Sequence, residues 1–416
     1  MSANLALIDS ARLMKRHKAM MRIGATGRGG VNRLALSPED TAARTALLEW
    51  AVSRGFSASI DPAGNLFVRR SGIDDQAPPV VTGSHLDSQP TGGNFDGVFG
   101  VLAAFEALEA LEDRLIQTMR PIELVVWMNE EGARFAPTTM GSGAFAGVLP
   151  LPEILTTRDG DGITVADALA TSIATLEKST PLARRPLGTR AHAYIETHIE
   201  QGPILDAADI AIGIVTGVQG LRQFEIVVSG VERHAGTTPK HQRKDALASA
   251  RAIITAIEAE CADDEDLVRF TVGRMEVRPG VLNTIPSEVV FTVDLRHPQA
   301  ATLDRLAASI ETAARTHAAP CTASVRPLLA SAPTVFDPAL IGRIAEACDR
   351  LGYSRRDLIS GATHDAKHLA DRCASGMIFI PCRDGISHNE AESAEPEHMI
   401  AGAAVLAEVV LGLAME

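Results

Sequence analysis

The chain has 416 residues, of which 46% are hydrophobic and 22% are charged, a balance typical of a globular protein with two or three domains. This composition excludes intrinsically disordered, collagen-like and coiled-coil proteins. The 39 basic and 52 acidic residues give a net charge of -13. That charge argues against a nucleic-acid partner, because proteins of that class carry a basic surplus.

The five cysteines are odd in number and form no CxxC pair, which predicts free thiols in a reducing compartment. The N-terminal residues lack the apolar stretch and cleavage site of a signal peptide. The most apolar late segment, residues 401–415, is too short to span a bilayer and contains Glu408. We therefore expect a cytoplasmic protein that contacts no membrane.

Helix and strand signals alternate in the first half of the chain. Roughly the first 60 residues read as helical, and Ser37, Pro38 and Asp40 form the start signal of a helix that runs through Trp50. Strands are predicted at 65–69, 79–82 and 122–128, and a helix at 97–115. This alternation predicts an α/β domain with a central, mostly parallel sheet flanked by helices.

The pattern changes in the middle of the chain. Its predicted elements are a strand at 223–229, a helix at 244–260, strands at 270–277 and 288–295, and a helix at 301–317. This order predicts a separate α+β domain at 214–330, whose open-faced sheet needs covering or pairing with a copy of itself. After residue 336 come a helix, a strand at 377–380 and a final helix. We predict one catalytic α/β domain built from 1–213 and 331–416, with the second domain inserted.

Histidines and acids lie beside glycines in several segments. His85 and Asp87 follow a predicted strand, and their i, i+2 spacing puts them on one side of an extended chain. One of them can bind a metal while the other orients it. A surface loop after a strand gives the same pattern. His198 and His388 lie next to turn-forming or polar residues, where a structural hydrogen-bonding histidine is the alternative.

Three acids complete the set. Asp96 lies among glycines just before a predicted helix, so it can approach a ligand or cap the helix. Glu130 and Glu131 end a buried strand, the place where open α/β sheets bind ligands. One can coordinate a metal while the other acts as a general base, although a solvated strand end is the alternative.

Together these segments supply five nitrogen or oxygen ligands: His85, Asp96, Glu131, His198 and His388. Five protein ligands exceed what one catalytic zinc takes. A carboxylate that bridges two metals about 3.5–4 Å apart would use them all. Because no thiolate is involved, Zn, Mn, Co and Ni are all compatible with this set.

Several blocks of the sequence occur in the order of a known family. They are GSHLDSQPTGGNFDGVFGVLAAFEAL, NEEGARFAPTTMGSGAFAG, HIEQGPILD, HAGTTP, RPGVLNTIP, VDLRHP, SGATHDA and SHNEAE, and they extend from about residue 80 to 395. The chain resembles the amidohydrolase branch of the peptidase M20 metallohydrolases. That branch contains N-carbamoyl-L-amino-acid hydrolases, β-ureidopropionases and allantoate amidohydrolases.

The resemblance implies a role for each ligand of two divalent metal ions. His85 and His198 resemble the terminal ligands of one ion. Glu131 and His388 resemble those of the other, and Asp96 resembles the bridging carboxylate.

The resemblance also implies roles for residues around the ions. Glu130 matches the catalytic base, and Asp87 matches the partner of the first histidine. Substrate contacts are implied for Gln201, His234, Asn283, Arg296 and Gly361. The second domain would be a lid and dimerisation domain, so a homodimer is expected. Glycine is common in the family where Thr363 stands, a departure that concerns the substrate and not the reaction.

The expected reaction is hydrolysis of an amide or ureido C–N bond in a small ureido or carbamoyl acid. A metal-bound water is a strong nucleophile at neutral pH, and Glu130 would take its proton and deliver it to the leaving nitrogen. His234 would stabilise the oxyanion, and Arg296 would hold the substrate carboxylate. Asn283 would hydrogen-bond the same carboxylate or its neighbour. Without the resemblance, these three residues also read as a surface histidine, a strand-end arginine and a turn asparagine.

Four functional hypotheses fit this sequence to different degrees. The leading hypothesis is an N-carbamoyl-L-amino-acid amidohydrolase or a related ureido acid hydrolase. The second is an allantoate or ureidoglycolate amidohydrolase. An aminoacylase or peptidase fits less well, because His198 stands where the peptidase branch has a carboxylate. An inactive scaffold fits least, because Glu130 and all five candidate ligands are present.

Overall fold

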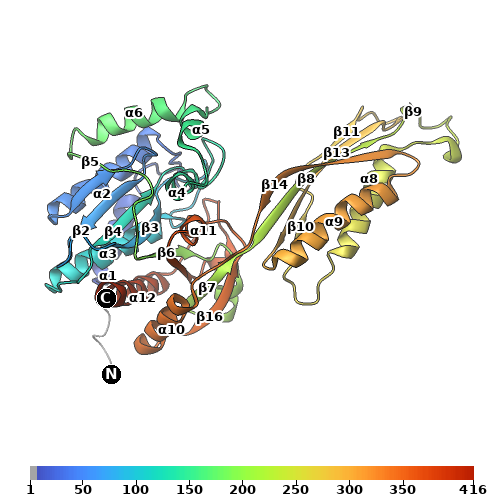
Figure 1. Cartoon of the computed structure of the whole chain (residues 1–416). Coiled ribbons are helices and arrows are strands. Elements are labelled where there is room, and N and C mark those ends of the chain that lie inside the picture. Colours follow the sequence, from blue (N-terminus) through green and yellow to red (C-terminus); the bar gives the residue numbers. More distant parts are fainter. Residues whose placement is uncertain (1–6) are drawn as a thin grey trace. The chain divides into compact units, whose positions relative to one another are not determined.

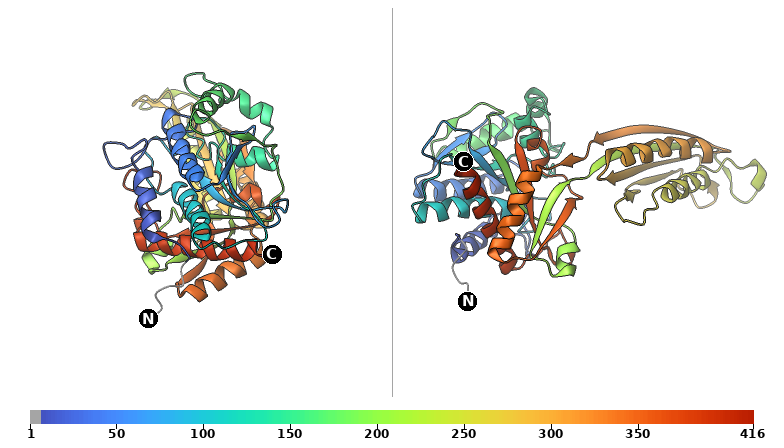
Figure 2. Two further views of the ribbon diagram at one scale, coloured as in Figure 1. Left: turned by 90° about the vertical axis from the view of Figure 1, so that its left-hand side faces the viewer. Right: turned by 60° about the horizontal axis from the view of Figure 1, so that its bottom comes forward.

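The computed structural model describes residues 7–416, which form two compact units. Unit 1 contains the chain up to Thr216 together with Val335–Glu416, and unit 2 contains Gly217–Thr334 (Figures 1 and 2). The sequence placed the corresponding divisions at 213/214 and 330/331. The catalytic and lid roles of these two segments stay predictions.

Unit 1 is built around a ten-stranded sheet with the order β15-β7-β17-β6-β3-β4-β2-β1-β5, and β16 pairs with β7. Its strands are β1 Ser57–Ile60, β2 Leu66–Arg70, β3 Val80–His85, β4 Ile122–Trp127, β5 Ala183–Arg184, β6 Ala193–Ile199, β7 Ile212–Val218, β15 Thr334–Val335, β16 Arg355–Ser360 and β17 Ala374–Ile380. The four inner strands β17, β6, β3 and β4 are parallel, whereas β2 and β7 run antiparallel to their inner neighbours. The predicted mostly parallel sheet is therefore confirmed at the centre of the unit.

Helices cover both faces of this sheet. They are α1 Ser10–Met20, α2 Pro38–Ser53, α3 Val98–Asp113, α4 Met140–Ala146, α5 Leu151–Thr156, α6 Val165–Leu176, α7 Ile204–Ala208, α10 Pro338–Leu351, α11 Ala366–Leu369 and α12 Pro396–Ala414. Alternate residues of β4 separate the two faces. Leu124 and Val126 join a core cluster with α3 and α12, while the ring of Trp127 contacts Phe145 of α4.

The N-terminal 60 residues contain less helix than the sequence predicted. The predicted helix after Ser37 is confirmed, and the Ser37 hydroxyl accepts a hydrogen bond from the amide of Asp40 at 3.1 Å. Irregular chain separates α1 from α2, however, and β1 occupies Ser57–Ile60. This irregular chain is held by the buried guanidinium of Arg33, which donates to the carbonyls of Leu86, Met20 and Ile23. Such long-range contacts leave no local sequence signal.

Unit 2 contains a five-stranded antiparallel sheet with two helices on one face, and a separate two-stranded sheet (Figure 1). Its elements are β8 Gly220–Ser229, β9 Arg233–His234, α8 Ala246–Glu260, β10 Arg269–Thr271, β11 Met275–Arg278, β12 Thr284–Ile285, β13 Glu288–His297, α9 Ala300–His317 and β14 Thr322–Ser331. Alternate residues of β8 and β13, such as Ile226 and Phe291, are buried against α8 and α9. The other face of the sheet is free of helices from its own unit, as the sequence predicted.

The strand predicted at 270–277 was wrong as a single element. It is divided into β10 and β11, which pair with different parts of β13. Residues 272–274 form no strand, and Gly273 lies among them. Glycine in a strand interior weakens pairing because it adds no packing side chain, which accounts for the break.

Helix α12 is long and apolar enough to cross a membrane by length and composition. It begins at Pro396, before the apolar segment 401–415 that was identified in the sequence. Its most apolar stretch is 67% buried inside the structure. Met399, Val405 and Leu406 belong to the same core cluster as β6 and α3. Helix α12 thus has the packing of a core helix.

Candidate metal centre and active site

The inner strands of unit 1 bring the candidate ligands to one edge of the sheet. His85 is the last residue of β3, His198 lies near the end of β6, and Glu131 follows β4. His388 lies in the loop after β17. Because these four strands are parallel, their carboxyl ends share an edge, which is where open α/β sheets bind ligands.

Asp96 lies at the centre of this cluster. One of its oxygens, Oδ1, lies 3.1 Å from His198 Nε2 and 3.5 Å from His85 Nε2. The other, Oδ2, lies 3.3 Å from His388 Nε2. Helix α3 begins after Gly97 and has no side-chain cap. The Asp96 carboxylate is therefore directed at the histidines and does not cap the helix.

Two groups of side chains in this cluster could each hold a metal ion. One is His85, Asp96 and His198, and the other is Asp96, Glu131 and His388. The donor atoms of each group lie within 4.8 Å of one another. Asp96 belongs to both groups, which is the arrangement that a bridging carboxylate requires.

The orientations of the histidines fit metal binding. His85 Nδ1 lies 2.9 Å from the carbonyl oxygen of Asp87, and His198 Nδ1 lies 2.9 Å from that of Ile199. Each carbonyl accepts the Nδ1 proton, so each Nε2 faces the cluster and is the atom that could bind a metal ion. The donors are imidazoles and carboxylates without a thiolate, a set that suits Zn, Mn, Co or Ni.

Glu130 lies buried beside the first group, with Oε2 3.6 Å from His85 Nε2. Its backbone amide donates to Asp87 Oδ1 at 3.3 Å, and the amide of Glu131 donates to Asp87 Oδ2 at 3.2 Å. We expected Asp87 to act on His85. Its carbonyl makes the short contact with that ring, while its carboxylate fixes the backbone that carries both glutamates.

Electrostatics in the cluster favour exchange of protons for cations. Burial raises the pKa of Glu130 well above its ordinary value and that of Glu131 to about 7. Burial also opposes ionisation of Asp96, but hydrogen bonds from the three histidines outweigh it and hold the Asp96 pKa well below its ordinary value. The contact with Asp96 raises the pKa of His388 to about 9. Divalent ions would displace these protons, because ligands bind metals in their deprotonated forms.

Three non-glycine residues around the cluster have left-handed backbone conformations. They are Asn129 at φ 52°, Gln201 at φ 56° and His388 at φ 54°. Asn129 donates through Nδ2 to the carbonyl of Phe135 at 2.7 Å, which fixes the turn between β4 and the two glutamates. Backbone strain of this kind collects at functional sites, where the surrounding structure maintains it.

Gln201 lies in the cluster, while its predicted substrate contact stays a prediction. Its Nε2 donates to Asp96 Oδ2 at 2.8 Å and to Ser387 Oγ at 3.2 Å. Glu392, which we did not predict, accepts hydrogen bonds from the amides of Phe95 and Asp96 at 2.9 and 3.1 Å. It lies in the SHNEAE block, so the signal was present without an indication of its role.

Two further buried residues were missed. Glu196 precedes His198 by two positions on β6 and thus shares its face of the strand. The ring of His364, in the SGATHDA block, lies 4.6 Å from that of His198. These three residues meet the distance criterion for a metal group. Both Glu196 oxygens already accept hydrogen bonds, from Ser84 at 2.7 Å and Ala366 at 3.1 Å, so we assign this group a supporting role.

Three predicted substrate residues lie in unit 2. The structure brings His234 and Asn283 together, because the amide of Ala235 donates to the Asn283 carbonyl at 2.9 Å and β9 pairs with β12. His234 Nδ1 accepts from two backbone amides, which leaves the proton on Nε2. Arg296 lies near the end of β13, about 25 Å along the strand from its start at Glu288. It is therefore not grouped with the other two.

Gly361 lies exposed in unit 1, directly after β16. A Cβ at this position would meet nothing within 4 Å. Neighbouring Ser360 hydrogen-bonds His364 at 2.9 Å, and His364 in turn contacts His198. The loop that carries Gly361 is thus anchored at the cluster, while its predicted substrate contact stays a prediction.

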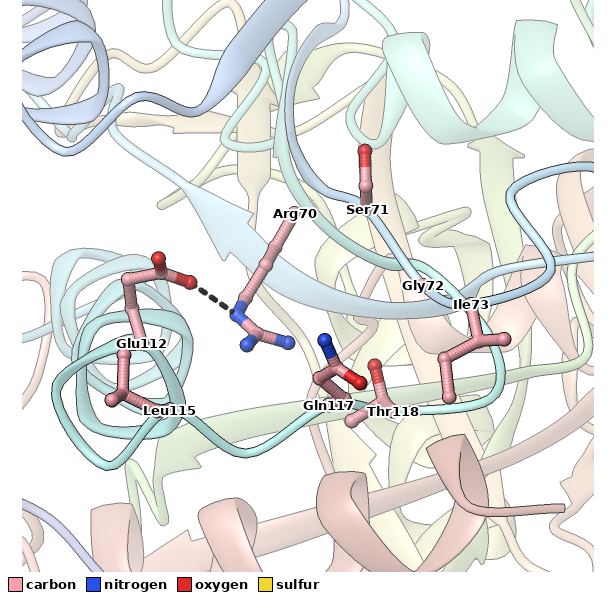
Figure 3. Close-up of a pocket in the computed structure, with 8 residues that line it drawn as sticks. All are labelled: Arg70, Ser71, Gly72, Ile73, Glu112, Leu115, Gln117 and Thr118. Carbon is pink, nitrogen blue, oxygen red and sulfur yellow. Dashed lines mark hydrogen bonds and ion pairs between the residues drawn. The ribbon is translucent and has the colours of Figure 1, made fainter.

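A separate pocket of about 360 Å³ lies between the end of β2 and the chain after α3 (Figure 3). Within it, Arg70 Nε donates to Glu112 Oε2 at 3.0 Å. Arg70 pairs with Ile122 at the start of β4, whereas Glu130 and Glu131 follow the other end of that strand. The pocket therefore lies at the opposite edge of the sheet and contains none of the predicted site residues.

Comparison with known proteins assigns the chain to a family. Residues 81–412 match the model of peptidase family M20/M25/M40. The chain is 40% identical over 409 residues to an N-carbamoyl-L-amino-acid amidohydrolase of Rhizobium meliloti, covering 97% of this chain and 96% of that protein. It is 32% identical over 399 residues to the allantoate amidohydrolase of Escherichia coli, covering 94% and 95%.

A solved structure agrees with this assignment. The crystal structure of an amidase of the hydantoinase/carbamoylase family from Burkholderia multivorans has a TM-score of 0.91 and 43% identity, and the match covers 98% of each chain. The chain therefore belongs to the peptidase M20 family. Within that family it falls among the amidohydrolases, which act on non-peptide C–N bonds, so it is a hydrolase. The expected family, fold class and enzyme class are all confirmed.

Proposed function

We propose that this chain is a dinuclear metal-dependent amidohydrolase that cleaves the carbamoyl C–N bond of N-carbamoyl-L-amino acids or closely related ureido acids. The single observation that carries the proposal is the shared position of Asp96 in two ligand groups, with Glu130 buried beside them. The 40% identity to a full-length N-carbamoyl-L-amino-acid amidohydrolase supports the substrate class.

Two divalent ions, when bound, would polarise the scissile group and lower the pKa of an attacking water. Glu130 would take a proton from the attacking water and later give it to the leaving nitrogen. The position of Glu130 supports a role as general base, because Asp87 fixes the Glu130 backbone and the Glu130 carboxylate faces the cluster. Hydrolysis then releases carbon dioxide, ammonia and the free amino acid.

Substrate recognition is assigned to five residues. They are Gln201, His234, Asn283, Arg296 and the backbone of Gly361. His234 carries its proton on Nε2, so it can donate to a developing oxyanion. The planar guanidinium of Arg296 suits a carboxylate.

We also propose a homodimer and a cytoplasmic location. Edge strand β14 of unit 2 exposes Leu328 and Leu329 at 43% and 51%, and an apolar edge of this kind is suited to cover by a second copy. All five cysteines are free thiols, which fits a reducing compartment. Light scattering of the metal-loaded protein tests the dimer, and a monomer at micromolar concentration would reject it.

A second candidate function is allantoate or ureidoglycolate hydrolysis. The 32% identity to an allantoate amidohydrolase over nearly the whole chain supports it, and the same catalytic groups would serve. The lower identity ranks it behind the carbamoyl substrates. A peptidase or aminoacylase has less support because of His198, and an inactive scaffold because the ligands and Glu130 are all retained.

The deciding experiment is ammonia release by the metal-reconstituted protein. The panel contains several N-carbamoyl-L-amino acids, N-carbamoyl-β-alanine, allantoate and ureidoglycolate, with the Glu130→Gln variant as the blank. We expect turnover of at least one N-carbamoyl-L-amino acid that is absent in the blank. Turnover of allantoate alone would establish the second candidate, and no turnover with metal bound would reject both.

A further inference from the structure

Two charged residues share the open face of the unit 2 sheet. On β13, the side chains of Val293 and Leu295 are buried against the helices, so the alternate residues Asp294 and Arg296 lie on the other face. Their exposed fractions are 25% and 33%. Both therefore remain accessible while being partly confined by the sheet.

Asp294 contacts the Arg296 guanidinium at two points. Oδ1 accepts from Nε at 2.8 Å, and Oδ2 accepts from Nη2 at 3.4 Å. A two-point contact fixes the plane of the guanidinium as well as its position. Asp294 is itself held by Gln223, directly opposite on β8, whose Nε2 donates to Asp294 Oδ2 at 2.7 Å.

Stabilisation of the fold is a weak explanation for this arrangement. Ion pairs with this exposure contribute little to stability, because solvent screens them and the side chains lose freedom. A fixed guanidinium plane has a clearer use in recognition. Arginine has several rotatable bonds, and a pre-oriented fork avoids their loss of entropy when a carboxylate binds.

We propose that Asp294, held by Gln223, is a positioning residue that orients Arg296 for the carboxylate of the ureido acid. The inference rests on the proposed function, because that function assigns the carboxylate to Arg296. Asp294 touches neither substrate nor reacting atoms. Its contribution is the orientation of the guanidinium, and the Gln223 contact keeps the Asp294 carboxylate in place.

The test separates carboxylate recognition from general damage. Kinetics are measured for the ureido acid that the wild type turns over fastest, and its primary amide is used as a competitive inhibitor. Asp294→Ala should raise the KM for the acid about tenfold, as expected for weakening a hydrogen bond to a charged group. The kcat should change less than about twofold, because ground-state and transition-state binding are weakened equally. The inhibition constant of the amide should stay within about twofold, because the amide lacks the carboxylate.

Two further variants sharpen the test. Gln223→Ala should change the same KM in the same direction by a smaller factor. Glu225→Gln is the matched control, because Glu225 pairs with Arg274 and Arg326 on the same face and has no proposed substrate role. It should leave both constants unchanged.

Four outcomes would overturn the inference. They are an unchanged KM for Asp294→Ala, a lower KM, a parallel weakening of acid and amide, and an effect of Glu225→Gln equal to that of Asp294→Ala. In each case wild-type turnover of ureido acids would leave the proposed function intact. Absence of wild-type turnover on every ureido acid would reject the proposed function, and with it this inference.

Discussion

The imidazole of His85 lies against the backbone of Gly97. A Cβ at position 97 would lie 2.4 Å from His85 Cε1 and Nε2, closer than any real contact. Gly97 also has φ +66°, a conformation that side chains disfavour. The position of a candidate metal ligand is therefore fixed by a residue that has no side chain.

Gly97→Ala should displace His85 and weaken the first metal group. We expect the variant to bind fewer than two ions and to lose at least about tenfold in turnover, because a misplaced catalytic geometry of about 1 Å can cost 10²-fold. Bound metal per chain and ammonia release are the measurements.

The matched control is Gly147→Ala. Gly147 has φ +79°, but a Cβ there would meet nothing within 4 Å. The Gly147→Ala variant should therefore have similar backbone strain and should retain its bound metal. Equal metal content and activity in the two variants would show that contact with His85 is unimportant.

Glu130→Gln should retain both ions and lose turnover by about 10²–10⁴-fold, because general base catalysis typically contributes that much. The exposed Glu153→Gln on α5 serves as the surface control and should behave as wild type. Metal content and kcat are measured on the same samples. A wild-type rate for Glu130→Gln would remove it as the base.

Asp96→Ala should reduce the bound metal to less than one ion per chain, because its carboxylate belongs to both groups. His198→Ala should weaken only one group and leave close to one ion. Metal titration followed by calorimetry distinguishes the two variants. Equal losses in both would mean that Asp96 does not bridge.

Stability should fall in acid because of His17. Burial lowers the pKa of this imidazole to about 3, and neither ring nitrogen has a hydrogen-bond partner among the described residues. The unfolded chain binds a proton below about pH 6.5, whereas the folded chain does not until about pH 3. Folding is therefore disfavoured increasingly as the pH falls between these values, by up to about 1.4 kcal/mol per pH unit.

The measurement compares wild type with His17→Leu in chelator, so that metal binding does not contribute. Between pH 7.5 and pH 5, the free energy of unfolding of the wild type should fall by about 2 kcal/mol more than that of His17→Leu. Titration of the other histidines cancels in the difference. Parallel pH profiles for the two proteins would contradict the prediction.

The structure brings the candidate ligands of the sequence together for a physical reason. His85, Glu131, His198 and His388 each follow or end a strand, and parallel strands bring such residues to one edge. Asp96 was ambiguous, because a helix cap and a ligand occupy the same place in sequence. The structure separates these two interpretations, because Gly97 is the N-cap of α3 and Asp96 precedes it.

What could not be predicted depends on contacts between distant residues. The Asp87 carboxylate bonds to the amides of Glu130 and Glu131, and no local pattern reveals such a bond. Similarly, the two-point contact between Asp294 and Arg296 could be suspected from i, i+2 spacing, but its support by Gln223 requires the register of β8 and β13. Residue types and order were accessible from sequence, while the pairing of side chains was not.

The position of β17 between β6 and β7 has a consequence for biosynthesis. The strand that carries His198 is made long before its neighbour, with the whole of unit 2 translated in between. At a translation rate of about 5–20 residues per second, β17 is synthesised on the order of ten seconds or more after β6. The nascent chain thus passes through a stage in which a central strand has an unpaired edge, a feature that favours aggregation, and His388 is the last of the candidate ligands to be synthesised.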